Sequence, residues 1–406
     1  MTGKMVRIAL VLALAIITAG CWDRKELNEL AITSATGFDV QDNQWIISYQ
    51  VIIPSSISSG MGGAGSSSGH SPVTVYSTKG RTIREAVAHS LLESPRRLYF
   101  AHNRVMVVSE RAAKKGLSPI LDVYFRQPDS RETVNMLVTK GSPKRILEQL
   151  MPSSRISGQG IQEIISLQSE NGSLLPAVKI YEYGSSIVGD ARSALLPEIL
   201  VSGSPDVTTT EQTNKTSQPS KLRLGQLAIM KEDKLVGWLN HRESLGVAFI
   251  TNKVNTVNIA FSCEESGDKN STFELLRSKT KVEPKQGDGG GFTISIAVDA
   301  YGTLEETECP LDLHKPEVIA GLEKQLAKEI EGSIRAALLA SRRHKSDVLG
   351  FASVIHRKFP KQWEAVKDEW DDLFPMVEME TKVSVTIERV GVSNKSFKEL
   401  ESPEGE

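Results

Sequence analysis

The first 21 residues, MTGKMVRIALVLALAIITAGC, determine which part of this chain folds and on which side of a membrane. Lys4 and Arg7 give a positive start, residues 8–17 form an unbroken apolar run, and small residues precede Cys21. This order is typical of an export signal. Ten helical residues cover roughly 15 Å, half of a ~30 Å hydrocarbon core, so the run is too short for a permanent membrane span. We therefore predict that residues 1–20 are removed as a signal peptide.

The cysteine that follows the small residues resembles a bacterial lipobox, in which the thiol receives a diacylglyceryl group and becomes the new N-terminus. Cys21 is then the predicted lipid anchor. Burial of two palmitate-length chains in the bilayer contributes a free energy on the order of 20 kcal/mol. A single chain gives only marginal, reversible binding. One departure is Thr18, which stands where leucine is commonest. The alternative is an ordinary secretory signal followed by a chance cysteine.

The mature chain has the length and charge of an exported globular protein. It keeps 386 residues and a formal net charge of −4, because Lys4 and Arg7 leave with the signal. This length is enough for two or three domains. A near-neutral balance lacks the basic footprint of a nucleic-acid-binding domain, so no nucleic-acid partner is expected. Cys263 and Cys309 are free to pair outside the cell, but their spacing does not show whether they do.

Period-two patterns and a capping motif predict alternating strands and helices in the first half of the mature chain. Thr82 and Glu85 form a capping box, which predicts a helix whose apolar face extends to Leu91. The other expected elements are strands over 31–40 and 45–53, a Gly/Ser-rich loop over 54–72, a strand over 98–108, a helix over 118–126, a strand over 133–139 and a helix that begins at Ser142.

Residues 202–221, SGSPDVTTTEQTNKTSQPSK, contain one large apolar residue, Val207, in twenty positions. Such a segment has little to pack into a core, so we predict a linker. The expected elements beyond it are two short strands within 222–239, a strand over 292–298, a long amphipathic helix over 319–338 and a last strand over 377–387.

These patterns predict an α+β fold, with mixed or antiparallel sheets packed against amphipathic helices in several domains. The expected order is a signal peptide at 1–20, an N-terminal region at 21–201 that breaks near 150, the linker at 202–221, a C-terminal domain at 222–395 and an acidic tail at 396–406.

Several short motifs do not carry chemistry. Gly60, Gly62 and Gly65 match G-x-G-x-x-G, and Gly65, Ser67 and Gly69 match G-x-S-x-G, but neither match continues into the helix that its mechanism requires. The seven histidines are scattered, without metal-ligand spacing. We therefore expect no catalytic residue, metal or cofactor.

Two other features leave alternatives open. The basic run at 342–345 follows the predicted long helix, where cations complement the negative end of the helix macrodipole; contact with anionic lipid headgroups is the alternative. Trp363 and Trp370 are seven residues apart and share a helical face. They are suited either to core packing or to docking of a partner.

The most specific stretch of the mature chain is CWDRKELNEL at 21–30. Three further stretches accompany it: GRTIREAVAHSLLESPRRLYFAHNRVMVVSE at 80–110, ILDVYFRQPDSR at 120–131 and DVLGFASVIHRKFPKQW at 347–363. With these motifs the chain resembles the Ger(x)C family, the lipoprotein C subunits of nutrient germinant receptors in spore-forming bacteria. The resemblance extends over almost all of the mature chain, and the departures are Thr18 and the Gly/Ser-rich insertion.

The resemblance implies a lipid-anchored, non-enzymatic subunit that triggers spore germination together with two integral-membrane partners, the A and B subunits, at the spore inner membrane. It also implies several mixed α/β domains. Cys21 carries over as the lipidation site. The residues that match the family pattern without an assigned role, and are candidates for a partner interface, are Trp22, Asp23, Arg24, His356, Arg357 and Trp363.

Two rival functions come from other classes of protein. A membrane-tethered solute-binding lipoprotein requires a ligand cleft between domains. A cell-wall hydrolase requires a carboxylate pair or a metal site, and the sequence suggests neither.

Overall fold

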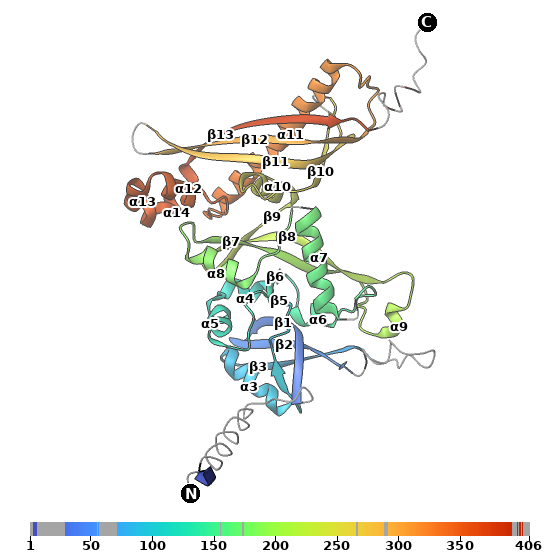
Figure 1. Cartoon of the computed structure of the whole chain (residues 1–406), viewed down its shortest axis with the longest axis vertical. Coiled ribbons are helices and arrows are strands. Elements are labelled where there is room, and N and C mark those ends of the chain that lie inside the picture. Colours follow the sequence, from blue (N-terminus) through green and yellow to red (C-terminus); the bar gives the residue numbers. More distant parts are fainter. Residues whose placement is uncertain are drawn as a thin grey trace.

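The structure is a computed structural model of the chain. It describes residues 3–5, 29–54, 56, 71–154, 156–172, 174–264, 267–287, 291–391, 396, 398 and 400. Cys21, Trp22, Asp23 and Arg24 lie outside the described residues, as do most of the Gly/Ser-rich loop and of the acidic tail. Figure 1 shows an elongated molecule with two sheets along its long axis, one in the N-terminal half and one in the C-terminal half.

The N-terminal sheet has nine strands, in the order β3-β2-β1-β5-β6-β7-β8-β9, with β4 paired to the start of β1. The central pairs β1–β5, β5–β6 and β6–β7 are parallel, and the outer hairpins are antiparallel, so the sheet is mixed. The strands are β1 (Leu30–Gln41), β2 (Gln44–Ile52), β3 (Val73–Gly80), β4 (Arg97–Tyr99), β5 (Val105–Ser109), β6 (Asn135–Thr139), β7 (Ser193–Gly203), β8 (Ser220–Lys231) and β9 (Lys234–Leu239).

Helices cover both faces of this sheet, because successive strand residues point to opposite sides. Buried residues of α3, α4, α5 and α8 share one core with the sheet, and those of α6 and α7 share another on its far face. The helices are α3 (Ile83–His89), the 3-10 helix η2 (Ser90–Leu92), α4 (Glu110–Lys115), α5 (Ser118–Arg126), α6 (Pro143–Glu148), α7 (Ser157–Asn171), α8 (Ile180–Val188) and α9 (Thr210–Thr213).

The C-terminal sheet has four strands in the order β10-β11-β12-β13, antiparallel except for the parallel pair β12–β13. The long helix α11 and the buried helix α10 share its core. The elements are α10 (His241–Ile250), β10 (Val257–Phe261), β11 (Ser271–Gln286), β12 (Phe292–Thr307), α11 (Pro316–Arg343), α12 (Phe351–Lys358), α13 (Pro360–Val366), η3 (Lys367–Glu369), α14 (Trp370–Leu373), η4 (Phe374–Met376) and β13 (Glu378–Arg389). Two mixed sheets with packed helices confirm the predicted mixed α/β class.

The expected single strand over 98–108 is wrong. The chain turns between β4 and β5, where the Asn103 amide donates to the Phe100 carbonyl at 2.9 Å. The Asn103 side chain is buried and donates to Thr36 Oγ1 at 2.9 Å and to the Tyr124 hydroxyl at 2.8 Å. The hydrogen bonds of Asn103 therefore fix a turn in a segment whose apolar alternation predicts one continuous strand.

Thr82 caps α3 as predicted, but the capping box is only half formed, because Glu85 Oε2 accepts from the Arg81 amide at 2.6 Å. The apolar face of the helix also ends earlier than expected. Thr82 Oγ1 accepts from the Glu85 amide at 3.1 Å, and Ile83 and Ala86 are buried. Helix α3 ends at His89 and the chain tightens into η2, which directs Leu91 outward with 64% of its surface exposed. A change of helical pitch rotates every later residue away from the buried stripe.

Residues 202–221, expected from composition to link two domains, fold against the N-terminal half. Strand β7 continues to Gly203 and β8 begins at Ser220, so the two ends of the segment pair with each other. Val207 between them is completely buried and accepts from the Leu150 amide at 2.7 Å. The chain passes to the second sheet only after Leu239, the end of β9.

Strand β8 separates two cores. Ala228 and Met230 belong to the core between the N-terminal sheet and its helices, whereas Leu227 and Ile229 belong to the C-terminal core. The period of two that places alternate side chains on opposite faces thus places them in opposite halves of the molecule. The two sheets are joined by continuous apolar packing.

Cys263 and Cys309 form a disulfide, with Cα atoms 6.7 Å apart. It joins the chain just after β10 to the chain just after β12. The pairing that the sequence left open is therefore resolved by the antiparallel order of β10, β11 and β12, which brings these two strand ends together.

Candidate functional site at the junction of the two sheets

Helix α10 forms the joint between the two halves. Asn240 and Glu243 make a reciprocal capping box: Asn240 Oδ1 accepts from the Glu243 amide at 3.0 Å, and Glu243 Oε2 accepts from the Asn240 amide at 2.8 Å. From Glu243 to Ile250 every residue is buried. At Gly246 the helix lies so close to α11 that a Cβ would sit 2.0 Å from the Ser333 carbonyl oxygen. The joint is therefore a close helix–helix contact.

Polar side chains from the two halves also meet across the junction. The Ser346 hydroxyl donates to Ser193 Oγ at 3.0 Å in a buried contact. Lys231 at the end of β8 pairs with Asp371 at 2.7 Å. Because the hydroxyl contact is excluded from water, it fixes the relative position of the halves more than an exposed ion pair does.

The buried carboxylate of Asp347 organises the turn into α12. Its Oδ1 accepts from the Phe351 amide at 3.0 Å, and its Oδ2 accepts from the Ala352 amide at 2.7 Å and from Trp370 Nε1 at 3.2 Å. Gly350 between them has φ +76°, a left-handed conformation that glycine adopts at low cost. Desolvation raises the pKa of Asp347 above its ordinary value, against the lowering effect of these donors.

His356 links the same segment to the N-terminal half. Its Nδ1 lies 3.0 Å from both carboxylate oxygens of Asp190, which precedes β7. The imidazole stacks on Trp363 at a centroid distance of 5.9 Å, and Trp363 contacts Trp370 edge-on at 5.3 Å. Both indoles are buried in the core, in agreement with the packing interpretation, while Arg357 is exposed. The 347–363 stretch thus builds the junction.

The basic run at 342–345, which begins in the last turn of α11, makes contacts within the protein. Arg343 pairs with Glu243 of α10 at 3.6 Å, and Lys345 pairs with Asp372 at 2.8 Å. The His344 ring lies over Gly237 of β9, where a Cβ would come within 2.2 Å of it. These contacts support the structural interpretation of the run over contact with lipid.

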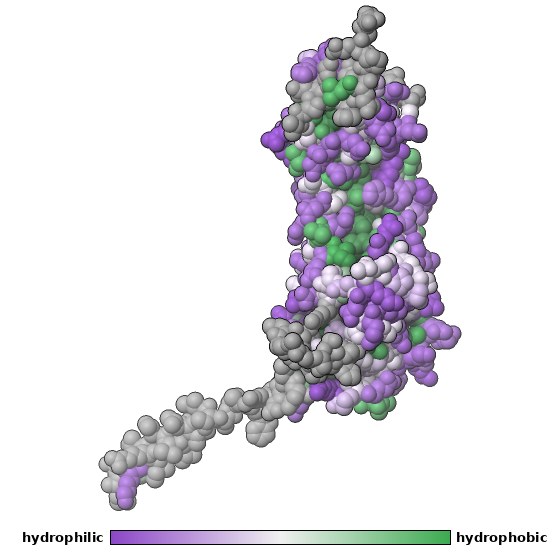
Figure 2. All heavy atoms as spheres, turned by 90° about the vertical axis from the view of Figure 1, so that its right-hand side faces the viewer, coloured by the Kyte–Doolittle hydropathy of each residue, from purple (hydrophilic) through white to green (hydrophobic). Residues whose placement is uncertain are grey.

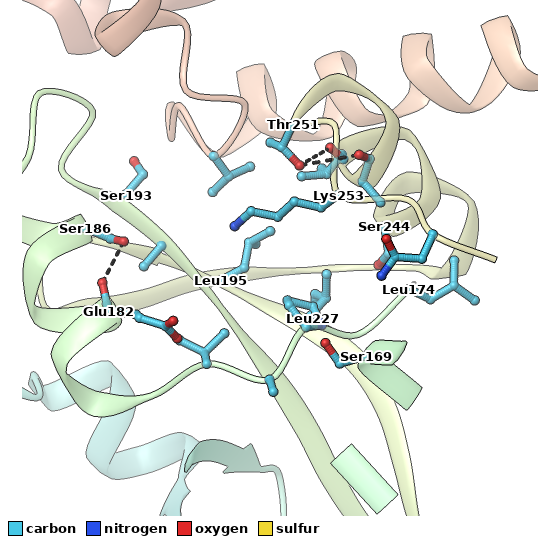
Figure 3. Close-up of a pocket in the computed structure, with 18 residues that line it drawn as sticks. Ser169, Leu174, Glu182, Ser186, Ser193, Leu195, Leu227, Ser244, Thr251 and Lys253 are labelled. Atoms are coloured by element: carbon cyan, nitrogen blue, oxygen red, sulfur yellow. Dashed lines mark hydrogen bonds between the residues drawn. The ribbon is translucent and has the colours of Figure 1, made fainter. Parts of the chain in front are cut away.

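A cavity of about 570 Å³ opens between the two halves beside this junction. Figure 2 shows apolar surface at the same level, midway along the molecule. The N-terminal half contributes the end of α7, the segment before α8, α8 itself, β7 and β8 (Figure 3). The C-terminal half contributes α10, the chain after it and Val348 before α12. The labelled lining residues are Ser169, Leu174, Glu182, Ser186, Ser193, Leu195, Leu227, Ser244, Thr251 and Lys253.

One cationic side chain extends into the cavity over an apolar floor. Figure 3 shows Lys253 reaching across the space beside Leu195 and Leu227. Within the described part of the chain, no ion pair joins its ammonium group to a carboxylate. The hydroxyls of Ser186 and Ser244 donate to backbone carbonyls, each at 2.8 Å, and no histidine lines the cavity. An ammonium group above an apolar floor is suited to binding a ligand with an anionic and an apolar part.

A second, polar cavity of about 580 Å³ adjoins the first, because Ser169 and Ala177 line both. Its charged and ionisable lining residues are His102, Arg104, Arg131, Glu170 and Lys179. His102 and Arg104 come from the 80–110 stretch and Arg131 from the 120–131 stretch, so two of the motifs in the sequence meet at this cavity. The excess of cations favours anionic groups here.

Neither metal chemistry nor a membrane span is found in the described part of the chain. No three His, Cys, Asp or Glu side chains there are placed to hold one ion. None of the described helices is both long and apolar enough to cross a bilayer.

The sequence does not reveal the N-terminal partners of this junction. Asp190 is 166 residues from His356, and Ser193 is 153 residues from Ser346. Neither residue lies in a motif. The only available signal is on the C-terminal side, where Asp347 stands three residues before Gly350, a spacing typical of a β-turn.

Comparison with known proteins identifies both halves. The family described as "Spore germination protein N-terminal domain" matches residues 23–201, and "Spore germination B3/GerAC like, C-terminal" matches residues 225–391. Spore germination protein KC of Bacillus subtilis (strain 168) is 30% identical over 404 residues, which cover 98% of each chain. Spore germination protein B3 of the same organism is 22% identical, over 96% of this chain and 99% of the relative.

A solved structure shares the fold. The chain titled "Crystal Structure of the GerBC protein" aligns with a TM-score of 0.54 at 18% identity, over 87% of this chain and 96% of the solved one. The likeness covers both halves of the molecule, and the relatives match it from end to end. This chain therefore belongs to the GerAC/GerKC family of spore germination proteins.

Proposed function

We propose that this protein is the lipid-anchored, non-enzymatic C subunit of a nutrient germinant receptor, acting with integral-membrane A and B subunits at the spore inner membrane. The observation that carries the proposal is the match of both family domains, along a chain whose predicted signal peptide at 1–20 is followed by Cys21. Names of relatives such as "Spore germination protein KC" support a role in germination.

The junction suits a subunit that transmits a signal or supports assembly of the receptor, rather than one that turns over a substrate. Its two sheets share a continuous core, and its buried polar contacts position the halves. A lipid anchor confines the protein to the membrane surface and raises its effective concentration toward membrane partners. Weak interfaces with the A and B subunits are then sufficient for assembly.

Replacing Cys21 with alanine is expected to remove the protein from the membrane fraction and to lower the rate of nutrient-triggered germination. The physical reason is that loss of two acyl chains removes a free energy of membrane binding on the order of 20 kcal/mol. The control is Thr18→Leu, which alters the same motif and keeps the thiol. Mass spectrometry identifies the N-terminus, and affinity capture from detergent-solubilised spore membranes identifies copurifying subunits. Unchanged germination with Cys21→Ala protein absent from the membrane would contradict the proposed anchor.

The cavity between the halves favours a second candidate, a membrane-tethered solute-binding lipoprotein. Lys253 above an apolar floor fits a small carboxylate with an aliphatic side chain. In this case, titration calorimetry of the purified protein with branched-chain amino acids or short aliphatic carboxylates gives a saturable signal that Lys253→Ala weakens at least about tenfold. Lys279→Ala, which removes an exposed lysine of β11, leaves the signal unchanged. Absence of any saturable heat would exclude the solute-binding candidate, and the proposal of a receptor subunit would be unaffected.

A further inference from the structure

Two consecutive leucines are presented to solvent between α3 and β4. Leu91 is 64% exposed and Leu92 is 84% exposed, the highest fraction for any large apolar side chain among the described residues. We call these two residues the leucine tip. An exposed adjacent pair differs from the singly scattered apolar residues that are normal on a protein surface.

The turn that carries the leucine tip is held by hydrogen bonds on both sides. Ser90 is buried and its hydroxyl donates to the Val87 carbonyl at 2.6 Å. On the other side, the Ser94 hydroxyl donates to the Arg96 carbonyl at 2.7 Å. These bonds keep η2 and the following turn in place, so the leucines are held outward.

The leucine tip lies at the anchored end of the molecule. Shortly after it, β4 pairs in parallel with the first residues of β1, Leu30 opposite Arg97. Figure 1 shows α3 at the end of the elongated molecule that is remote from β12 and β13. Eight peptide steps separate Cys21 from Glu29, and they span at most roughly 29 Å. An acyl chain on Cys21 therefore keeps this end within reach of the headgroups.

Cationic side chains accompany the leucine tip. Arg96 and Arg97 follow it in the sequence and are exposed, and the only ion pair of Arg97 in the described chain is a long one, 3.9 Å, to Asp129. Glu93 is the single carboxylate between Leu92 and Arg97. Each cation near an anionic membrane surface contributes about 1 kcal/mol of attraction in general, so the pair complements headgroups.

We propose that the leucine tip inserts into the interfacial layer of the membrane, with Arg96 and Arg97 at anionic phospholipid headgroups, and so gives the protein a second membrane contact beside its lipid anchor. The proposal rests on the proposed function, because acylated Cys21 brings this end to the bilayer. Apolar side chains flanked by arginines are typical of segments that lie in a membrane interface. Two contacts orient the molecule, with the C-terminal sheet directed away from the lipid.

The test uses the full chain, purified in detergent and reconstituted into phosphatidylcholine vesicles with or without phosphatidylglycerol. Leu92→Cys carries an environment-sensitive dye, and brominated lipids report its contact with acyl chains. The native thiols do not compete, because Cys263 and Cys309 are disulfide-bonded and acylated Cys21 has no free thiol. The matched control is Val188→Cys at the end of α8, where the side chain is 83% exposed. Both substitutions replace exposed side chains, so folding is not at issue.

With phosphatidylglycerol present, lipid quenching at position 92 is expected to exceed that at position 188 at least about threefold. The double change Arg96→Gln and Arg97→Gln should reduce the difference. Equal quenching at both positions in an acylated, vesicle-bound chain would contradict insertion of the leucine tip, while the proposed lipid anchor would be unaffected. If mass spectrometry shows that the chain is not acylated, both the proposed lipid anchor and the proposed membrane contact of the leucine tip are contradicted. If the dye at position 92 is shielded from solvent only in native membranes that contain the other subunits, the result contradicts lipid contact and indicates a protein partner instead.

Discussion

Replacing Gly246 with alanine is expected to lower the free energy of unfolding by about 3 kcal/mol or more. The new Cβ would lie 2.0 Å from the Ser333 carbonyl oxygen and 2.6 Å from its carbonyl carbon. Both are backbone atoms in the middle of α11, so no side-chain rotation relieves the overlap. The two helices must separate, and the apolar contacts around them are lost. Urea unfolding of the purified protein measures the effect.

The control for this prediction is Gly321→Ala in α11, the helix that Gly246 of α10 packs against. A Cβ at Gly321 meets nothing within 4 Å, and the residue is exposed. Alanine there is expected to raise stability by about 0.5–1 kcal/mol, because glycine costs conformational entropy inside a helix. Opposite signs for the two substitutions identify close helix approach as the cause. A stability loss below about 1 kcal/mol for Gly246→Ala would be incompatible with it.

Replacing Asp347 with alanine is expected to lower the free energy of unfolding by roughly 4 kcal/mol, because three buried donors lose their acceptor. These donors are the Phe351 and Ala352 amides and Trp370 Nε1. Asparagine restores the side-chain volume only, since in either orientation of its amide at least one donor faces an NH₂ group. Asp347→Asn should therefore remain destabilised. The exposed Asp372→Ala is the control and should have little effect, because its carboxylate pairs with Lys345 at the surface.

The contribution of Asp347 should also depend on pH. Burial raises its pKa in the folded protein, so the native state keeps this proton at pH values where the unfolded chain has lost it. The unfolded value is about 3.9, so the contribution is greatest below about pH 4 and declines as the pH rises toward the native pKa. The measurement is the difference in unfolding free energy between wild type and Asp347→Ala across this range. A difference that grows with pH would show that the pKa is lowered instead.

Elements with a strong local pattern were predictable from the sequence. Helix α5 begins at Ser118 and ends at Arg126 as expected, and the two strands expected within 222–239 correspond to β8 and β9. Helix α11 follows its apolar repeat because one stripe faces the core and the opposite face is in water. In each case the pattern and the tertiary environment agree.

Elements that are buried on all sides, or held by distant contacts, were not predictable. Helix α10 has no polar face beyond its first turn, so it shows no periodic stripe. The prediction of one strand over 98–108 failed because the turn depends on Thr36 and Tyr124, which contact Asn103 from other elements. The junction likewise depends on Asp190, which carries no local signal. Lipidation of Cys21 and a partner role for Trp22, Asp23, Arg24, His356, Arg357 and Trp363 remain predictions.

The alternation along β8 has a mechanical consequence. A slip of one residue in its register would exchange Leu227 and Ile229 with Ala228 and Met230, placing small or mismatched side chains in both cores at once. Neither half can release this strand without disrupting the other, so the halves resist hinge bending and unfold together. With the proposed anchor at one end, displacement of the far sheet would be transmitted as rotation of the whole body about its attachment.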